Sequence, residues 1–357
     1  MSDQSRPPVA RKPVRPMRVF VRPNSRAEEL RHPRAKQRRP SREALAPGLR
    51  PAPEHDLKFR GGRTIPQLSY LNFYVGGRAA WAQSDVDSID SALAAAMSDS
   101  RLNNVMRQYF ANQPISTTFL GSHFAGATSP SQVNQTSAEQ LVGALFSGGQ
   151  LSGLDFPSTV VNLMLPRGTV LTDGTGTGPE RTGGDEAARG AARPGTPEAE
   201  EASSLQGLGG YHGSVEAGGG RIYYAVGAYS QRLPDGGENG IAVFDVPWKN
   251  VVATFYHELN EARTDPDVEV AINTGRVDGV IGWNSDDGEE VGDFPVFEAH
   301  DLGSLALVFQ EVALAQGGTA PVQFQYSNAV HGPEGPIDAP HELLIAQEME
   351  GVPAERV

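Results

Sequence analysis

The sequence predicts an α+β fold in which a mixed sheet packs on one central helix. Strand-like and helix-like segments are mixed without strict alternation, which favours an α+β over an α/β architecture. Residues 248–266, WKNVVATFYHELNEARTDP, form the predicted central helix. Pro247 suits its first turn and Pro266 ends it. Its apolar side chains recur at helical spacing, as expected of a helix packed into a core: Val251, Val252, Phe255 and Leu259.

The elements before a long insertion follow from local patterns. LSYLNFYV at 68–75 is rich in branched and aromatic residues and is expected to be a strand. A helix capped by Ser84 or Asp85 follows and reaches Met97, because its apolar residues recur at helical spacing. The next elements are a short helix at 102–109, a strand at 116–120, a helix at 137–146 capped by Ser137, and a buried strand at 158–165.

Residues 172–210 are low in complexity and nearly free of large apolar side chains, which predicts a flexible insertion. A strongly alternating strand at 221–229 follows before the central helix. The elements after that helix are short segments at 268–272 and 280–283, a helix at 305–314 and a strand at 321–326. We therefore expect a single domain at 64–330 and a Pro- and Glu-rich tail at 331–357 that frays.

Charge is divided unevenly along the 357 residues. Residues 1–63 hold 17 Lys and Arg against 6 Asp and Glu, a net charge of +11, whereas the remainder holds 13 against 37, a net charge of −24. The first 63 residues are also rich in Arg and Pro and lack a periodic apolar pattern, so we expect a disordered basic arm. Such an arm suits an anionic partner (nucleic acid, anionic lipid or the acidic body itself), or else a solubilising or processed leader.

Several function classes lack support in the sequence. With no cysteine, the chain has no disulfide framework and no thiolate ligand or nucleophile, so a transition-metal site must use His, Asp and Glu. No run approaches the roughly 20 apolar residues of a membrane span, and the N-terminus lacks the apolar region of a secretory signal. These absences favour a cytoplasmic protein. No interleaving of aromatic and basic residues indicates a specific nucleic-acid interface.

The middle of the central helix carries a candidate metal motif. His257 and Glu261 are four residues apart and project from one face, and Glu258 can reach towards the same point. This is the H-E-x-x-H pattern of zinc hydrolases with glutamate in place of the second histidine. Zn²⁺ accepts imidazole and carboxylate ligands, and the neighbouring carboxylate of Glu258 could act as general base towards metal-activated water. The alternative interpretation is a solvated acidic helix face.

The third ligand is open on sequence alone. His212 is preferred, because it completes a His/His/Glu set with one open coordination position, although it could equally be a loop histidine in a Gly-rich turn. Asp293 and Glu290 are the alternative ligands, whereas Asp265 is assigned to a turn. The acidic run at 286–293 could bind Ca²⁺ but lacks the EF-hand order, which favours a solvated loop.

Five segments, in this order, resemble the exordium-like, phosphate-induced protein family. They are GYHGS (210–214), IYYAVGAY (222–229), HELNEARTDP (257–266), GWNSDDGEEVGD (282–293) and VQFQYSN (322–328). Related bacterial proteins carry HELAEAxTDP, then GWxxxxGxEIGD, and a closing VQxxWSN. The resemblance spans about 65–330 and implies a zincin-like, metal-binding fold.

The chain departs from this family at several points. Asn260 stands where the family usually has Ala, and Tyr326 where it has Trp. Members are often secreted and contain cysteines, whereas this chain has none. The family is better known for extracellular, growth-associated roles than for an established reaction, so the resemblance implies more about fold than about activity.

Two functions from different classes remain. The first is a zinc-dependent hydrolase of peptide bonds, with His257, Glu261 and His212 as ligands, Glu258 as base, and the 222–229 strand holding an extended substrate by edge pairing. The second is a non-catalytic binding or scaffold module that keeps the zincin fold. A weaker third is a component of a complex whose basic arm docks on an acidic partner, a contact that salt would weaken.

Overall fold

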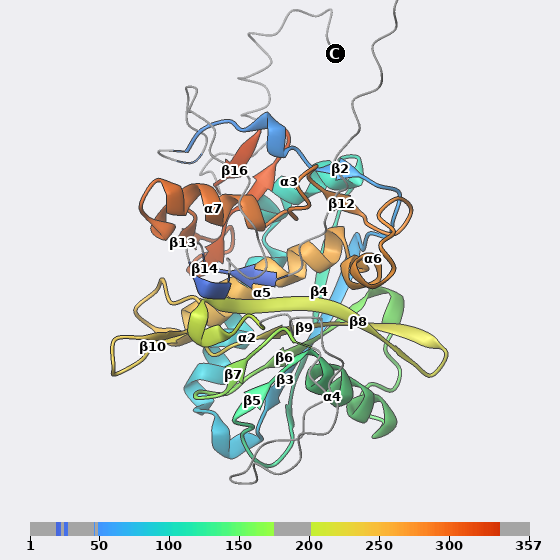
Figure 1. Cartoon of the computed structure of the whole chain (residues 1–357), viewed down its shortest axis with the longest axis vertical. Coiled ribbons are helices and arrows are strands. Elements are labelled where there is room, and N and C mark those ends of the chain that lie inside the picture. Colours follow the sequence, from blue (N-terminus) through green and yellow to red (C-terminus); the bar gives the residue numbers. More distant parts are fainter. Residues whose placement is uncertain (1–18, 23–24, 28–45, 47–48, 175–200, 336–357) are drawn as a thin grey trace, which may run out of the picture.

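The fold is α+β, as the sequence predicts, and is built on a six-stranded mixed sheet (Figure 1). The computed structural model describes residues 19–22, 25–27, 46, 49–174 and 201–335. The strands of the sheet, in spatial order, are β1 (Val19–Val21), β8 (Leu208–Ala217), β9 (Gly220–Gly227), β6 (Thr159–Met164), β3 (Gln67–Val75) and β4 (Ser116–Ala125). The last four run parallel to one another, whereas β8 is antiparallel to β9, and β1 is antiparallel to β8.

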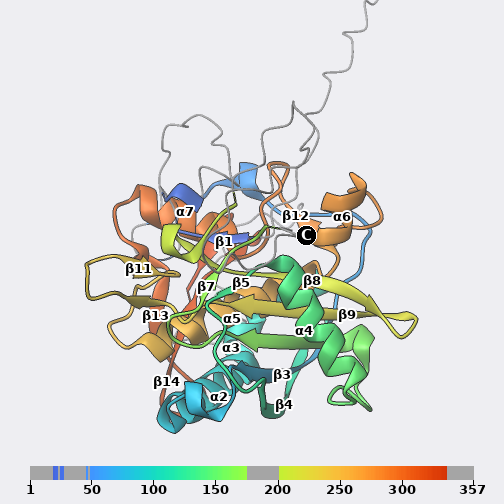
Figure 2. The same ribbon diagram turned by 60° about the horizontal axis from the view of Figure 1, so that its bottom comes forward.

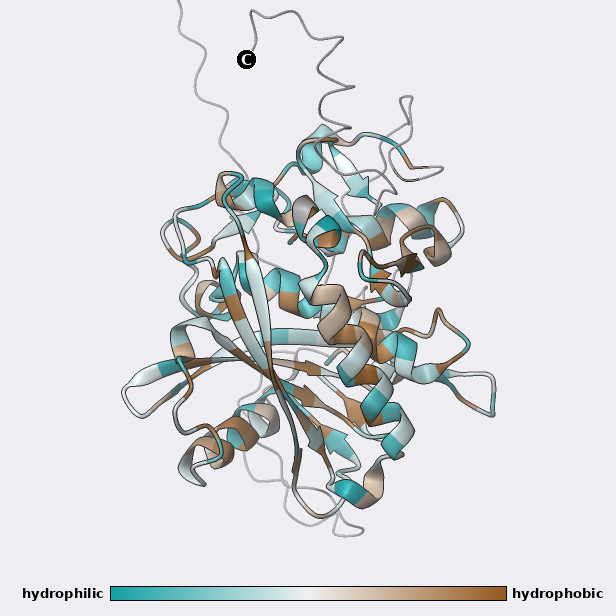
Figure 3. Ribbon diagram, turned by 180° about the vertical axis from the view of Figure 1, so that it is seen from behind, coloured by the Kyte–Doolittle hydropathy of each residue, from teal (hydrophilic) through white to brown (hydrophobic). Residues whose placement is uncertain are grey.

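Helices cover both faces of this sheet (Figures 1 and 2). In chain order the α-helices of the described residues are α2 (Gln83–Ser98), α3 (Ser100–Arg107), α4 (Gln135–Ser147), α5 (Pro247–Thr264), α6 (Val268–Thr274) and α7 (Asp293–Asp301). α2 and α5 share one apolar cluster with the sheet, and α4 packs in a second cluster on the other face. Figure 3 shows the brown, apolar residues running along the strands between these layers.

The central helix α5 is buried on all sides. Pro247 occupies its first turn, and every residue of 250–264 is buried. The sheet covers one side, while α7 and the two hairpins of the C-terminal part lie above the other (Figure 1). The polar side chains of α5 are therefore enclosed between two layers, which rules out the solvated acidic face that the sequence left open.

The remaining strands form short two-stranded pairs. They are β13 (Phe309–Ala313) with β14 (Thr319–Gln323), β15 (Gln325–Ser327) with β16 (Gly332–Glu334), β12 (Trp283–Asn284) with β2 (Lys58–Phe59), β5 (Gln132–Val133) with β7 (Val170–Leu171), and β10 (Gln231–Arg232) with β11 (Glu238–Asn239). β14 packs against α5 and α2, and so brings the C-terminal part onto the central helix.

Several boundaries differ from the sequence prediction. The predicted helix at 305–314 is wrong: a 3₁₀ turn precedes β13, which pairs with β14, so tertiary pairing overrides a pattern that fits both periods. The cap of α4 is Asn134 and not Ser137, which instead sits at the third helical position and completes a capping box. The acidic run predicted as a solvated loop ends in the first residue of α7, a helix that the sequence pattern does not indicate.

The arm and the insertion are partly built into the fold. Val19–Val21 pairs with β8, and 49–63 packs against the C-terminal part, so these stretches are ordered where a disordered arm was predicted. Residues 201–210 likewise lead into β8 and are mostly buried. The rest of the predicted arm, insertion and tail (1–18, 28–45, 175–200 and 336–357) lies outside the described residues. In the part of the chain that the structure describes, no helix is long and apolar enough to cross a membrane.

Candidate metal centre

Three segments distant in sequence bring acidic and histidine side chains together around α5. The helix supplies His257, Glu258 and Glu261, β8 supplies His212, the loop before α7 supplies Glu290, and the first residue of α7 is Asp293. Each of these six side chains belongs to a residue that is at most 5% exposed. All four predicted metal ligands and the predicted base thus lie in one buried region. These six residues and Asp265, at the end of α5, are here called the acidic cluster.

The donor atoms of the acidic cluster form two overlapping groups. His257, Glu261 and Asp293 offer ligand atoms within 4.8 Å of one another, and so do His212, Glu258 and Glu261. The sequence favoured His212 as third ligand. The structure instead groups His257 and Glu261 with Asp293, which the sequence kept as an alternative.

One donor atom of the first group, Nε2 of His257, has no hydrogen-bond partner and faces Glu261. Nε2 of His257 lies 3.0 Å from Oε2 of Glu261, yet it has no hydrogen-bond partner, so the two atoms approach without the angle that a hydrogen bond needs. The other oxygen of Glu261 accepts from the Gly292 amide at 3.1 Å, and Oδ2 of Asp293 accepts from the Glu290 amide at 2.9 Å. Two donors of a tetrahedral Zn²⁺ lie roughly 3.3–3.5 Å apart, so this pair, at 3.0 Å, would have to open by a few tenths of an ångström to share the ion.

The opposite edge of the His257 ring is held by an amide. Nδ1 of His257 lies 2.8 Å from Oε1 of Gln323, and the amide group of Gln323 in turn donates to the Gly292 carbonyl at 3.1 Å. Because an amide oxygen only accepts, Nδ1 carries a proton, and in the neutral ring the lone pair of Nε2 then faces Glu261. Metal-binding histidines are oriented in this way in known metal sites.

The second group resembles an acid–base pair more than a ligand set. Nε2 of His212 donates to the Asp265 carbonyl at 3.0 Å, which leaves Nδ1 to face Oε2 of Glu258 at 3.3 Å. An imidazole nitrogen and a carboxylate oxygen at this distance share a proton. Both nitrogens of His212 therefore have hydrogen-bond partners. His212 thus packs beside Glu258, and its group with Glu258 and Glu261 is also one that could hold an ion.

Electrostatics show that the acidic cluster lacks positive charge. Five carboxyl groups, on Glu258, Glu261, Asp265, Glu290 and Asp293, share the region with two imidazoles. Within the described residues, none of these carboxylates forms an ion pair with Lys or Arg. Burial of an uncompensated carboxylate is costly, so such a group either takes up a proton or binds a cation.

The pKa values follow from this imbalance. Burial and the nearby Glu261 raise the pKa of Glu290 and Asp293 well above the usual carboxyl range. Burial also raises the pKa of Asp265 to about 7. Burial alone would lower the pKa of His257, but the nearby carboxylates of Glu261, Glu258 and Asp293 together outweigh it and raise this pKa to about 9. All four shifts favour bound protons, which a metal ion would displace.

Two glycines let the chain approach the acidic cluster closely. A Cβ at Gly292 would overlap Nδ1 of His257, and a Cβ at Gly210 would lie 2.8 Å from Oε1 of Glu258. That oxygen and both oxygens of Glu290 have no hydrogen-bond partner, although they are buried. Buried acceptors without partners in an acidic interior are satisfied by bound protons or by a cation.

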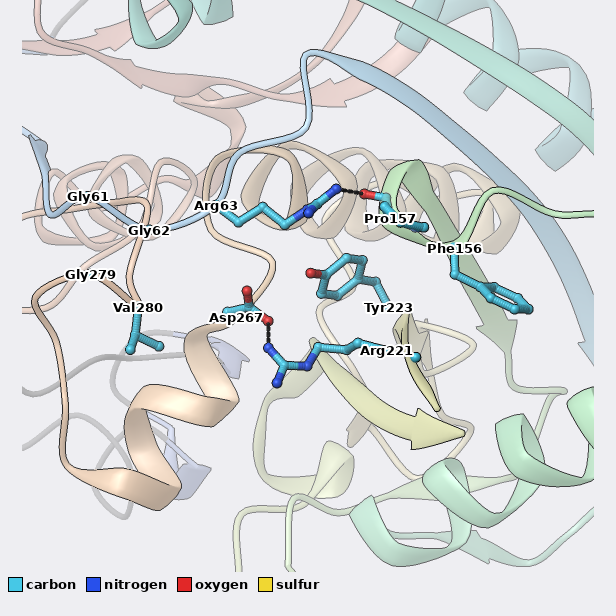
Figure 4. Close-up of a pocket in the computed structure, with 11 residues that line it drawn as sticks. Gly61, Gly62, Arg63, Phe156, Pro157, Arg221, Tyr223, Asp267, Gly279 and Val280 are labelled. Carbon is cyan, nitrogen blue, oxygen red and sulfur yellow. Dashed lines mark hydrogen bonds and ion pairs between the residues drawn. The ribbon is translucent and has the colours of Figure 1, made fainter. Parts of the chain in front are cut away.

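Other candidate positions lie apart from the acidic cluster. His55, Asp287 and Glu289 form a third group, but His55 binds Glu289 at 2.7 Å and Asp287 is exposed. Asp286 of the acidic run pairs with Lys58 and Arg60 at the surface. A cavity of about 660 Å³ lies between Arg63, Tyr223 and Arg221, which binds Asp267 at 2.6 Å (Figure 4); the acidic cluster does not line it.

The expected substrate strand is not available for edge pairing. Residues 222–227 lie in β9, which pairs with β8 on one side and β6 on the other, so this strand has no free edge. The role of Gln323 could not be predicted from the sequence. Nothing near this strand residue indicates that its amide contacts a histidine 66 positions away.

Comparison with protein-family models, curated proteins and solved structures finds no match to this chain. The function therefore has to be argued from the acidic cluster itself.

Proposed function

We propose that this protein is a zinc-dependent hydrolase that acts on peptide bonds. The observation that carries the proposal is the free Nε2 of His257 facing Oε2 of Glu261 inside a buried cluster short of positive charge. His257, Glu261 and Asp293 would hold the ion, which would supply a Lewis acid that polarises a carbonyl and acidifies water. The resemblance to the exordium-like family and its zincin-like fold agrees with this assignment and stays a prediction.

The remaining residues of the acidic cluster supply the proton transfers. Glu258 follows His257 in α5 and has one unpartnered oxygen, so it can accept the proton of an attacking water molecule. His212 lies 3.3 Å from its other oxygen and is fixed by the Asp265 carbonyl, so it can share that proton until the leaving amine takes it. Burial raises the pKa of Glu258, which makes its carboxylate a stronger base than an exposed one.

A second function is favoured by one observation, the complete burial of the acidic cluster. A structural metal has a closed site, whereas a catalytic metal keeps an open position. A non-catalytic binding or scaffold module would use the ion only to brace α5.

Peptide cleavage distinguishes the hydrolase from the scaffold module. The zinc-loaded protein is tested against a fluorogenic peptide library beside a Glu258→Gln variant with equal zinc content. Cleavage that depends on Glu258 supports the hydrolase, and equal zinc content with no cleavage by either protein supports the scaffold.

A further inference from the structure

The strand β1 lies directly over the acidic cluster. The ring of Phe20 stacks on the ring of His257, with 4.0 Å between centroids and 26° between planes. Phe20 is 1% exposed, and its ring centroid also lies 6.1 Å from that of Phe309 in β13. A residue of the N-terminal segment thus covers one face of the histidine that the proposed metal ion needs.

The main chain of β1 occupies the outer edge of β8. Val19 pairs with Tyr211 and Phe20 with Gly210, in antiparallel register, and a shift then brings Val21 opposite Leu208. Figures 1 and 2 show this dark-blue strand at the edge of the sheet beside β8. An edge strand offers unpaired backbone groups, and extended peptides bind such edges by antiparallel addition. The place of β1 in the sheet is therefore one that a separate peptide could take.

The position beside β8 that β1 occupies, here called the seat, has room for an aromatic side chain. A Cβ at Gly209 would lie 2.6 Å from Cδ1 of Phe20 and 3.1 Å from Ile241, so only glycine leaves room for the ring. The next glycine, Gly210, is opposite Phe20 in the register and also contacts the carboxyl of Glu258. The backbone of Phe20 consequently lies across from the residue on which the proposed base packs.

The neighbours of Phe20 extend the recognition to both sides of the strand. Val21 is 2% exposed and joins the apolar cluster on the opposite face of the sheet. Arg22 pairs with Glu238 at 3.1 Å, at a position where both side chains reach solvent. The seat thus takes an aromatic residue on the α5 side, an aliphatic residue on the other, and then a cation.

We propose that this seat is a docking groove for an extended peptide of that pattern, and that β1 occupies it in cis and closes the acidic cluster. As a statement about substrate, the inference rests on the proposed hydrolase function. The docking itself needs neither metal nor cleavage, so it can be measured without them. A peptide in solution must compete with a tethered strand whose effective concentration is of millimolar order.

The test uses the full chain and a fluorescein-labelled peptide, MRVFVRP, with the sequence of residues 17–23. Anisotropy is measured in EDTA with wild type, Phe20→Ala and a matched control, Phe59→Ala, whose ring is 54% exposed on β2. We expect Phe20→Ala to bind the peptide at least tenfold more tightly than wild type or the control, and the peptide MRVAVRP to bind at least tenfold more weakly than MRVFVRP. Equal binding by all three proteins would overturn the proposal.

A reversible disulfide that holds β1 against β8 provides a control for misfolding. The chain has no natural cysteine, and Val21 and Leu208 face each other across an antiparallel pair, whose Cα separation of roughly 4.5–5.5 Å suits a disulfide. The Val21→Cys/Leu208→Cys protein keeps Phe20, and it should bind millimolar peptide when reduced and lose that binding when oxidised. Binding unchanged by oxidation would refute the shared seat. Zinc content and cleavage, measured separately, show whether the hydrolase proposal fails on its own.

Discussion

Oε1 of Gln323 accepts a 2.8 Å hydrogen bond from Nδ1 of His257, and this contact fixes which nitrogen of the histidine faces the carboxylates. The amide of Gln323 is itself held, since its nitrogen donates to the Gly292 carbonyl and Gln325 donates to Oε1 at 3.1 Å. The acidic cluster therefore has an outer layer of hydrogen bonds that orients a donor atom towards the place an ion would take.

Replacing Gln323 should weaken metal binding without removing a ligand. In Gln323→Met the ring of His257 loses the acceptor at Nδ1, and we expect zinc affinity to fall by about 10–100-fold. A competition titration with a chromogenic chelator measures this. Gln310→Met, in β13, removes an amide that donates to the Leu307 carbonyl, away from the acidic cluster, and should leave the affinity unchanged. Equal affinity in wild type and Gln323→Met would contradict the orienting role.

A methyl group at Gly292 should damage the acidic cluster. Because the added Cβ would overlap the His257 ring, which packing prevents from moving away, Gly292→Ala should lower the free energy of unfolding by about 1–3 kcal/mol. It should also reduce zinc affinity. In the matched control Gly143→Ala, in α4, the Cβ meets nothing within 4 Å, and the change should stabilise by roughly 0.5–1 kcal/mol. Urea unfolding compares the two, and a neutral Gly292→Ala would argue against the close packing.

Substitution of the two glutamates of α5 should separate the loss of zinc binding from the loss of peptide hydrolysis. Glu261→Gln removes a ligand oxygen and should abolish stoichiometric zinc binding. Glu258→Gln should keep the metal and lower the rate of peptide hydrolysis by about 10²–10⁴-fold, as for loss of a general base. Steady-state kinetics on zinc-loaded proteins measures the second effect. Full activity in Glu258→Gln would remove Glu258 from the proposed mechanism.

Stability of the metal-free protein should fall as pH rises. Asp265, with an ordinary carboxyl pKa when unfolded, has a pKa of about 7 when folded, so the folded state binds the extra proton and loses stability between about pH 4 and 7. His257, with its pKa raised to about 9, contributes stability that is complete below about pH 6.5 and is lost as pH approaches 9. Both shifts act in the same direction, and a three-unit shift corresponds to about 4 kcal/mol.

Thermal unfolding at pH 5 to 9 measures this dependence in EDTA and with zinc. The melting temperature in EDTA should decrease with pH. Zinc displaces the protons, so the stabilisation that it gives should grow with pH. A metal-free protein that becomes more stable from pH 5 to 8 would contradict the charge balance described for the acidic cluster.

The long, strongly patterned elements can be predicted from sequence. The apolar stripe and the prolines of α5 indicate its limits, and the four-residue spacing alone puts His257 and Glu261 on one helix face. β3 lies within one residue of its predicted bounds, and α2 ends one residue past Met97, although it begins at Gln83, before the predicted caps Ser84 and Asp85. In each of these elements, local periodicity and tertiary packing favour the same secondary structure.

The parts that the sequence does not predict depend on distant contacts. Three residues, VFV, in a basic and Pro-rich arm are too few to predict a strand, and β1 forms only because β8 has an edge to pair with. The proposed preference for Asp293 over His212 as third ligand also comes from distant contacts, because nothing in the sequence shows that the Asp265 carbonyl takes Nε2 of His212. The apolar residues of β13 fit helical spacing, and only its pairing with β14 makes it a strand.

The metal content of the purified protein tests the central claim most directly. Elemental analysis is done on wild type, Asp293→Asn and His212→Asn after incubation with zinc and desalting. The account predicts about one zinc per chain in wild type and in His212→Asn, and none in Asp293→Asn. A wild-type protein that retains no metal would contradict the proposed metal centre, and loss of zinc in His212→Asn but not in Asp293→Asn would reverse the ligand assignment.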